Sequence, residues 1–170
     1  YHVHACDNPF AAREWVQKDW PGIVLSDVCM PGCSGIDLMT LFHQDDEQLP
    51  IVLITGHGDV PMAVEEMKRG AVDFLQKPVS LKPLQAALEH GLTVSGERFA
   101  QKKVVDCYQQ LTPKERELAL LVMKGLMNRE IAQAMSIAVR TVEVHRARVM
   151  EKMQAGSLAE LVSKLQRVTR

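Results

Sequence analysis

The fold of the last third of the chain is decided by residues 111–153, which read LTPKERELALLVMKGLMNREIAQAMSIAVRTVEVHRARVMEKM. Thr112 to Glu115 is a capping-box pattern with proline at the first helical position, and it predicts the start of a helix. Leucine and valine then recur at helical spacing until Gly125, where we expect the helix to end. A second, short helix is predicted from Asn128, with Ile131, Ala132 and Met135 on its buried side.

A tight turn over residues 136–139 and a third helix over about 140–153 complete a helix-turn-helix pattern. Val142, Val149 and Met153 are the inward positions of the third helix. A second capping box, Ser157 to Glu160, opens a fourth helix. Its predicted inward residues are Leu158, Leu161, Val162 and Leu165.

The outward face of the third helix combines small residues at its centre with arginines at its flanks. Such a helix can enter the major groove of DNA. A four-helix bundle with a solvated basic face fits the charge and periodicity equally well. The outward residues are Glu143, Val144, Ala147 and Glu151, flanked by Arg140 and Arg148. Phosphate contacts, which position a helix without reading sequence, are expected from Arg140, His145, Arg146 and Lys152.

Residues 1–90 alternate strand and helix signals, which predicts an α/β doubly wound parallel sheet. Buried strands are expected at Ile23–Leu25 and Ile51–Ile54, because continuous apolar runs are typical of strands covered on both faces. An edge strand is expected at Tyr1–Ala5 and a short strand at Phe74–Gln76. The first helix is expected to begin after Asn8, which is a typical helix cap. Three further helices are expected over about 35–44, over about 59–69 and from Leu81 toward Gly91.

The charge of the chain is divided between its two ends. The formal net charge of the 170 residues is −1, but residues 1–90 carry 13 acidic and 6 basic side chains, and residues 111–170 carry 6 and 11. This asymmetry predicts two domains with different partners, over 1–90 and 111–170, joined by a partly helical linker over 91–110. The four cysteines have no CxxC spacing, so free thiols and a cytoplasmic location are expected.

The C-terminal stretch resembles the LuxR-type helix-turn-helix, and its third helix resembles the FixJ-like branch of response regulators. The resemblance implies that Glu143, Val144, Ala147 and Arg148 face bases, while Thr141 and His145 hold the DNA backbone. It rests on Leu111, Thr112, Arg116, Glu117, Gly125, Asn128, Glu130, Ile131, Ala132, Thr141, Val142, His145, Met150 and Lys152.

One position departs from the LuxR-type pattern. The recognition helix usually follows a serine-like cap, and here that position is Ala138. Loss of a cap typically costs about 1 kcal/mol. We therefore expect a frayed start of this helix that becomes ordered on DNA.

Three polar side chains end the predicted parallel strands of the N-terminal half. Asp27, Thr55 and Lys77 each follow a strand, and the carboxyl ends of parallel strands meet at one edge of the sheet. A carboxylate, a hydroxyl and an ammonium group together suit phosphoryl transfer to the carboxylate. Taken singly, the aspartate is more often a loop cap and the lysine a surface charge.

Together these positions resemble the receiver domain of two-component response regulators. The motifs are Asp27 to Pro31 with Gly35, Thr55 to Gly58, and Asp73 to Pro78. The resemblance implies that Asp27 is the phosphoacceptor and that Thr55, Phe74 and Lys77 form the switch. It also implies a Mg²⁺ ion, held by the carboxylate of Asp27 and the main-chain carbonyl of Cys29.

The resemblance begins at the second strand of a receiver. In the strand order 2-1-3-4-5, the first strand, which carries an acidic pair for Mg²⁺, lies between Tyr1–Ala5 and Ile23–Asp27. We expect that strand and the first helix to be missing. The expectation is an incomplete flavodoxin-like receiver, as in a fragment or an incomplete gene model of a longer regulator.

The leading hypothesis is a transcriptional regulator switched by phosphorylation of Asp27. The partners expected are double-stranded DNA, a sensor histidine kinase, a second copy of the phosphorylated chain and RNA polymerase, but no membrane. One alternative is a DNA-binding protein that does not depend on phosphorylation. A phosphohydrolase with an aspartate nucleophile is disfavoured, since Cys29 stands where such enzymes have a second aspartate. We therefore expect no enzyme activity.

Overall fold

The structure is a computed structural model that describes residues 2–16, 21–30, 33–34, 39–42, 49–56 and 67–169. The chain divides into two compact units, Tyr1–Phe99 and Ala100–Arg170. Each unit has its own hydrophobic core. No helix among the described residues is long and apolar enough to cross a membrane.

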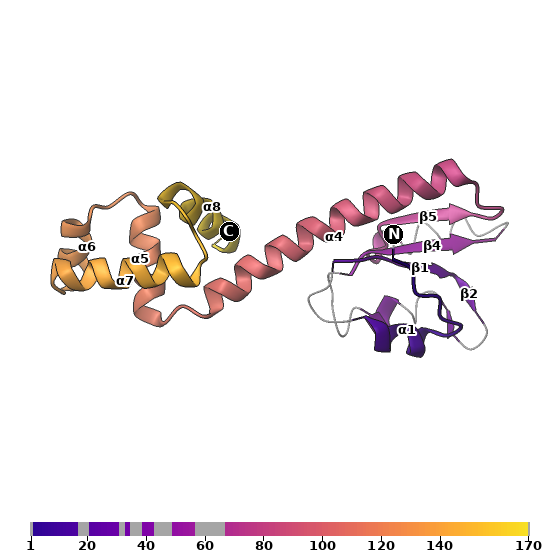
Figure 1. The fold of residues 1–170 in the computed structure, drawn as a ribbon, viewed down its shortest axis with the longest axis horizontal. Coiled ribbons are helices and arrows are strands. Elements are labelled where there is room, and N and C mark those ends of the chain that lie inside the picture. Colours follow the sequence, from indigo (N-terminus) through magenta and orange to yellow (C-terminus); the bar gives the residue numbers. More distant parts are fainter. Residues whose placement is uncertain are drawn as a thin grey trace. The chain divides into compact units, whose positions relative to one another are not determined.

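The first unit is built on a parallel sheet of three described strands, in the order β1 (Val24–Asp27), β4 (Ile51–Thr55), β5 (Asp73–Gln76) (Figure 1). The central strand β4 is buried over most of its length, as its apolar run predicts. The prediction that β1 is also covered on both faces is wrong at Leu25, which is 41% exposed. Because β1 lies at an edge of the described sheet, less of its surface is covered than that of β4.

The segment before β1 is only partly as predicted. Helix α1 (Pro9–Trp15) begins at its expected cap, where the backbone N–H of Ala11 donates to Asn8 Oδ1 over 2.8 Å. The predicted edge strand at Tyr1–Ala5 is not formed over its described residues, and Val3 is 81% exposed. A strand requires a hydrogen-bonded neighbour, and no described strand lies beside this segment.

Two short strands that the sequence did not predict, β2 (Cys29–Met30) and β3 (Cys33–Ser34), pair antiparallel after β1. Two predicted helices fall largely outside the described residues. Of the helix expected over about 35–44, residues 39–42 are described and helical. Of the helix expected over about 59–69, residues 67–69 are described and the first two are helical.

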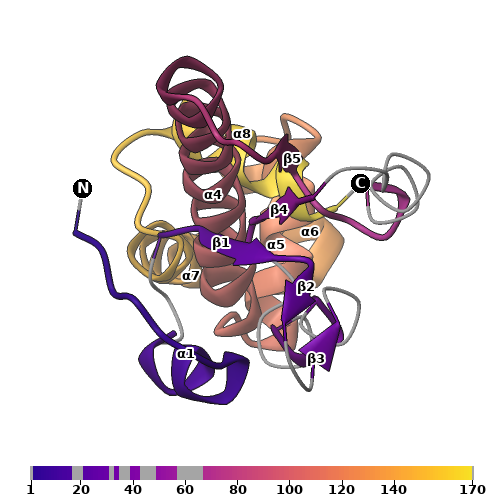
Figure 2. The same cartoon turned by 90° about the vertical axis from the view of Figure 1, so that its right-hand side faces the viewer.

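Helix α4 (Leu81–Gln109) is 29 residues long and continues well past Gly91. A Cβ atom at Gly91 would lie 3.1 Å from Ile23 Cγ2, so this glycine allows a close approach between the helix and the segment that leads into β1. Ala87 is buried in one hydrophobic cluster with Val52 and Leu75. Figure 2 shows α4 behind the strands β1, β4 and β5. The helix therefore covers part of the sheet.

The second unit contains four further helices, as the sequence predicts: α5 (Pro113–Met123), α6 (Asn128–Met135), α7 (Val139–Lys152) and α8 (Leu158–Val168) (Figure 1). The last turns of α4 also belong to this core, because Val104 and Cys107 are buried in it. Its most completely buried large side chains are Leu118, Ile131, Val142, Val149, Met153, Leu161 and Leu165.

Local capping motifs explain most of the helix ends. Thr112 and Glu115 form the predicted reciprocal capping box of α5. Gly125 has φ +83°, the left-handed conformation that glycine adopts most easily after a helix. Ser157 caps α8 by accepting from the Glu160 N–H, but the Glu160 carboxylate accepts from the Gly156 N–H in place of the predicted Ser157 N–H.

The predicted inward orientation of Leu158 is wrong. It is the first residue of α8 and is 47% exposed, whereas Leu161 and Leu165 are fully buried. Helical spacing predicts which side of a helix faces inward, but not at which residue the helix meets its neighbour.

Candidate phosphoacceptor site and nucleic-acid interface

The three polar residues that end the parallel strands lie at one edge of the sheet. Asp27 is the last residue of β1 and Thr55 the last of β4, while Lys77 directly follows β5. The Lys77 ammonium group forms an ion pair with Asp27 Oδ2, and its backbone N–H donates to the Thr55 carbonyl over 2.8 Å. The parallel register thus assembles the carboxylate, the hydroxyl and the ammonium group that the sequence places at strand ends.

The surroundings of these groups differ in exposure. Thr55 is 4% exposed, whereas the side chains of Lys77 and Asp27 are 50% and 30% exposed. Phe74, the residue matched to the switch aromatic, is 36% exposed in β5. The carboxylate is accessible to a reactant from solvent, while the hydroxyl beside it is held inside.

The described residues do not by themselves make a magnesium site. Among them, no three side chains of His, Cys, Asp or Glu come together in a way that could hold a metal ion. Asp27 supplies a carboxylate, and Cys29, matched to a carbonyl ligand, begins the short strand β2 two residues later. Mg²⁺ is usually held by one or two carboxylates and keeps several water ligands, so Asp27 and the carbonyl of Cys29 could supply two of its six positions.

Helix α7 has the two faces that its sequence predicts. Val142, Val149 and Met153, just after its end, are at most 1% exposed. The opposite face is open to solvent, and its side chains are small at the centre. The predicted outward residues Glu143, Val144, Ala147 and Glu151, with Arg140 and Arg148, are all exposed.

Several charged side chains of α7 are engaged within the unit. Arg140 forms an ion pair with Glu143, with 3.1 Å between Nη1 and Oε2. Arg146 Nη1 donates to Asn128 Oδ1 over 3.0 Å and so ties α7 to the start of α6. His145 is partly buried, and its Nδ1 has no hydrogen-bond partner among the described residues.

Lys152, one of the residues predicted to contact phosphate, is used inside the unit. Its ammonium group donates to Glu115 Oε2 over 2.7 Å and to the Gln110 carbonyl over 3.2 Å. Burial raises the pKa of Glu115, but the hydrogen bonds from Lys152 and Thr112 and the charge of Lys152 outweigh it and lower the pKa to about 2. Sequence reasoning found the capping box but missed this ion pair, since nothing local relates residues 37 positions apart.

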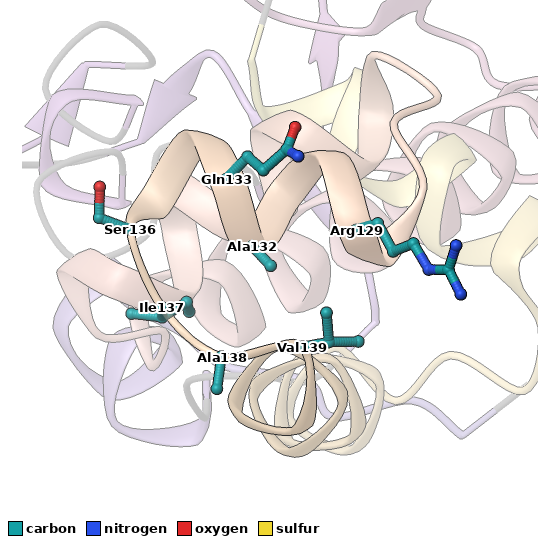
Figure 3. Close-up of a pocket in the computed structure, with 7 residues that line it drawn as sticks. All are labelled: Arg129, Ala132, Gln133, Ser136, Ile137, Ala138 and Val139. Atoms are coloured by element: carbon teal, nitrogen blue, oxygen red, sulfur yellow. The ribbon is translucent and has the colours of Figure 1, made fainter.

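A shallow pocket of about 460 Å³ lies at the turn between α6 and α7 (Figure 3). The side chains of Ala132 and Val139 point into the space between the two helices, and that of Arg129 extends away from it. Ala138, the residue before α7, makes no side-chain cap hydrogen bond, as its sequence predicts. The carbonyl of Ala138 still accepts from the backbone N–H groups of Thr141 and Val142 over 2.9 and 3.1 Å.

Comparison with known proteins identifies both halves of the chain. Residues 1–89 match the response regulator receiver domain, and residues 109–165 match the bacterial regulatory proteins of the luxR family. The tetrathionate response regulatory protein TtrR of Salmonella typhimurium strain LT2 is 67% identical over 147 residues, which cover 86% of this chain and 71% of that protein. The transcriptional regulatory protein FixJ of Bradyrhizobium diazoefficiens is 45% identical over 146 residues, which cover 83% and 71%.

A solved structure of the response regulator StyR agrees with this assignment. It superposes with a TM-score of 0.67 at 37% identity, and the match covers 95% of this chain and 84% of StyR. The chain belongs to the two-component response regulators that join a receiver domain to a LuxR-type DNA-binding domain, and it is a transcriptional regulator of that family.

Proposed function

We propose that a sensor histidine kinase phosphorylates Asp27 and that this modification controls the binding of double-stranded DNA by α7. The observation that carries the proposal is the meeting of Asp27, Lys77 and Thr55 at the carboxyl edge of the sheet. Ligands and reacting groups gather at this edge in open parallel sheets. The boundaries that we propose for the three parts are 1–90, 91–110 and 111–170.

The reaction forms an acyl phosphate on the Asp27 carboxylate and breaks the bond between phosphorus and the histidine nitrogen of the kinase. Lys77, which is ion-paired with the carboxylate, would then neutralise an oxygen of the new phosphoryl group. The Thr55 hydroxyl would turn toward another of these oxygens. Phe74, which pairs with Leu53 two residues before Thr55 in the β4–β5 register, would follow the movement of the edge.

The surface affected by this switch includes β5 and the start of α4. We propose that the phosphorylated receiver pairs with a second copy through this surface, to which the helix expected over about 59–69 would contribute. Most of that helix lies outside the described residues. Mg²⁺ is the ion that receiver domains typically use, and RNA polymerase is the further partner that we expect for a DNA-bound regulator.

The DNA interface that we propose is the exposed face of α7. Val144 and Ala147 are small enough to let the helix sit deep in a major groove. Glu143 and Arg148 would reach base edges from the same face. The residues proposed to contact the DNA backbone are Arg140, Thr141, His145 and Arg146. Lys152 is proposed with them only as a long-range charge, because its ammonium group is bound to Glu115.

The proposal is tested with acetyl phosphate as the phosphodonor and magnesium chloride in the buffer. The wild-type chain and the Asp27→Asn variant are analysed by intact-mass spectrometry for the addition of one phosphoryl group. Asp73→Asn is the matched control, because Asp73 is the first residue of β5, at the opposite end of the strand, and its Oδ1 accepts from the backbone N–H of Phe74. Phosphorylation is expected in the wild type and in Asp73→Asn, but not in Asp27→Asn.

Binding to promoter DNA is then measured for each chain with and without the phosphodonor. The switch predicts tighter binding, or dimer formation, after phosphorylation of the wild type alone. Phosphorylation at another residue, or equal DNA affinity in all states, would refute the switch. Equal and strong binding without phosphorylation supports the alternative of a phosphorylation-independent DNA-binding protein.

The 67% identical relative is named for a response to tetrathionate. We infer that the kinase acting on this chain responds to tetrathionate as well. A reporter gene under the regulated promoter is expected to respond to added tetrathionate with wild type but not with Asp27→Asn. A response of equal size in both strains would show that tetrathionate does not act through phosphorylation of Asp27.

A further inference from the structure

Glu143 is an acidic residue in the first half of the outward face of α7, close to Arg140. Glu143 is 47% exposed, and its Oε2 is held by Arg140, whose side chain is 87% exposed. The two residues are three positions apart, the spacing at which side chains of a helix become neighbours. The other carboxylate oxygen, Oε1, has no protein partner among the described residues.

A carboxylate on a surface that approaches DNA is repelled by the phosphates. It can offset this cost only by accepting a strong hydrogen bond from a donor in the groove, because an ionised carboxylate has no proton to donate. The major groove offers two such donors, the N4 amino group of cytosine and the N6 amino group of adenine. Adenine presents its N7 acceptor next to N6, which would repel the carboxylate, whereas cytosine has a C–H group in that place.

The ion pair changes what the carboxylate can do. Arg140 neutralises the charge of Glu143 locally, which weakens the repulsion by phosphates, and it holds one oxygen, which limits the rotamers of the side chain. The guanidinium group also remains mostly in solvent and can approach a phosphate at the same time. Glu143 therefore reaches the groove as a partly neutralised, oriented acceptor.

We infer that Glu143 is a specificity-determining residue that accepts a hydrogen bond from the N4 amino group of a cytosine, and that Arg140 is the positioning residue for this contact. The inference rests on the proposed binding of DNA by α7 and adds the base that one side chain reads. It makes the bound site require a C·G base pair at one fixed position.

The test is a selection of bound sequences from a duplex DNA library with randomised central base pairs, using the phosphodonor-treated full chain. Wild type, Glu143→Ala and Arg140→Ala are compared with Arg140→Lys, which restores the charge. The matched control is Glu151→Ala, an exposed acid on the same face two turns further along α7. Circular dichroism confirms that each variant retains its helices.

The wild-type motif is expected to contain one C·G pair whose preference, about 10- to 100-fold over the other pairs, disappears in Glu143→Ala. Arg140→Ala weakens the same preference and Arg140→Lys restores part of it. In Glu151→Ala the motif is unchanged. A Glu143→Ala motif identical to that of wild type, or a lost preference for a pair other than C·G, would overturn the inference. If wild type selects no motif at all, the proposed DNA binding itself fails.

Discussion

Replacing Lys152 by methionine is expected to destabilise the C-terminal unit far more than loss of a surface ion pair would. The side chain of Glu115 is 3% exposed, and its Oε2 accepts from the Lys152 ammonium group and from the Thr112 backbone N–H. Lys152→Met keeps most of the packing of the aliphatic stem. The substitution removes the ammonium donor, so that of these two donors only the Thr112 N–H still binds the buried carboxylate.

The size of the effect follows from the pKa of Glu115. Burial raises this pKa, but hydrogen bonds from Lys152 and Thr112 lower it from 4.5 to about 2. At about 1.4 kcal/mol per pH unit, the difference corresponds to about 3 kcal/mol of folding free energy in favour of the ionised form. Part of this belongs to Thr112, and Lys152 is 32% exposed, so we expect Lys152→Met to cost about 2 kcal/mol at pH 7.

Glu115→Gln is the informative comparison. Its amide oxygen can still accept from the Thr112 N–H, so the capping box survives, and the partly exposed Lys152 can be hydrated. We expect a cost of about 1 kcal/mol, which is smaller than that of Lys152→Met. The asymmetry arises because a carboxylate left buried without its cation is costlier than an ammonium group at the surface.

The pH dependence has a definite sign. Because the pKa of Glu115 is lower in the folded chain, its stabilising contribution is complete above about pH 4.5 and is lost as the pH falls toward 2. The difference in unfolding free energy between wild type and Lys152→Met is therefore expected to be largest above pH 4.5 and to shrink below it. Urea denaturation followed by far-UV circular dichroism measures it. Tryptophan fluorescence does not, since Trp15 and Trp20 both belong to the first unit.

Two results would refute this reasoning. One is a cost for Lys152→Met no larger than that for Glu115→Gln, and the other is a difference that does not change between pH 7 and pH 3. The salt dependence of DNA affinity tests the other role predicted for Lys152, which is contact with a phosphate. If Lys152 also contacts phosphate, the methionine variant loses about one from the slope of log affinity against log salt concentration.

Three further substitutions test local features. Gly96→Ala within α4 places a methyl group in open space at helical backbone angles, so we expect it to stabilise the chain by about 0.5–1 kcal/mol. Gly125→Ala also places a methyl group in open space but at φ +83°, so we expect it to destabilise the chain by about 1 kcal/mol. Urea denaturation measures both changes. Ala138→Ser supplies the missing cap of α7 and is expected to add about 1 kcal/mol and to slow amide exchange over Val139–Val142, measured by hydrogen–deuterium exchange. Exchange in wild type that is already as slow there as in the middle of α7 would contradict the frayed start.

The features that the sequence predicted best are those encoded within a few residues. The caps at Asn8 and Thr112, and the left-handed Gly125 after α5, each depend on neighbours three or four positions away. The inward and outward faces of α7 follow from a single period, so their prediction was also correct. Such local signals do not depend on how the rest of the chain packs.

The features that the sequence did not predict depend on what a segment packs against. Tyr1–Ala5 has the alternation of a strand but no described partner, and Leu25 has the hydrophobicity of a buried residue but lies in an edge strand. The hydrogen bonds of Lys152 to Glu115 and of Arg146 to Asn128 join different helices. No period or motif relates such pairs, and only the packing of the helices shows them.

These contacts between helices also determine which part of α7 remains available to DNA. The C-terminal end of the helix is bound into the unit, because Lys152 satisfies a buried carboxylate and a carbonyl. The N-terminal end has no side-chain cap, and its Arg140 is 87% exposed and forms an ion pair with one oxygen of Glu143. Recognition helices contact base edges chiefly with their N-terminal residues. The formal charge of residues 111–170 therefore overstates the charge at the proposed interface, and the first two-thirds of α7 is the part whose chemistry can decide the sequence that is bound.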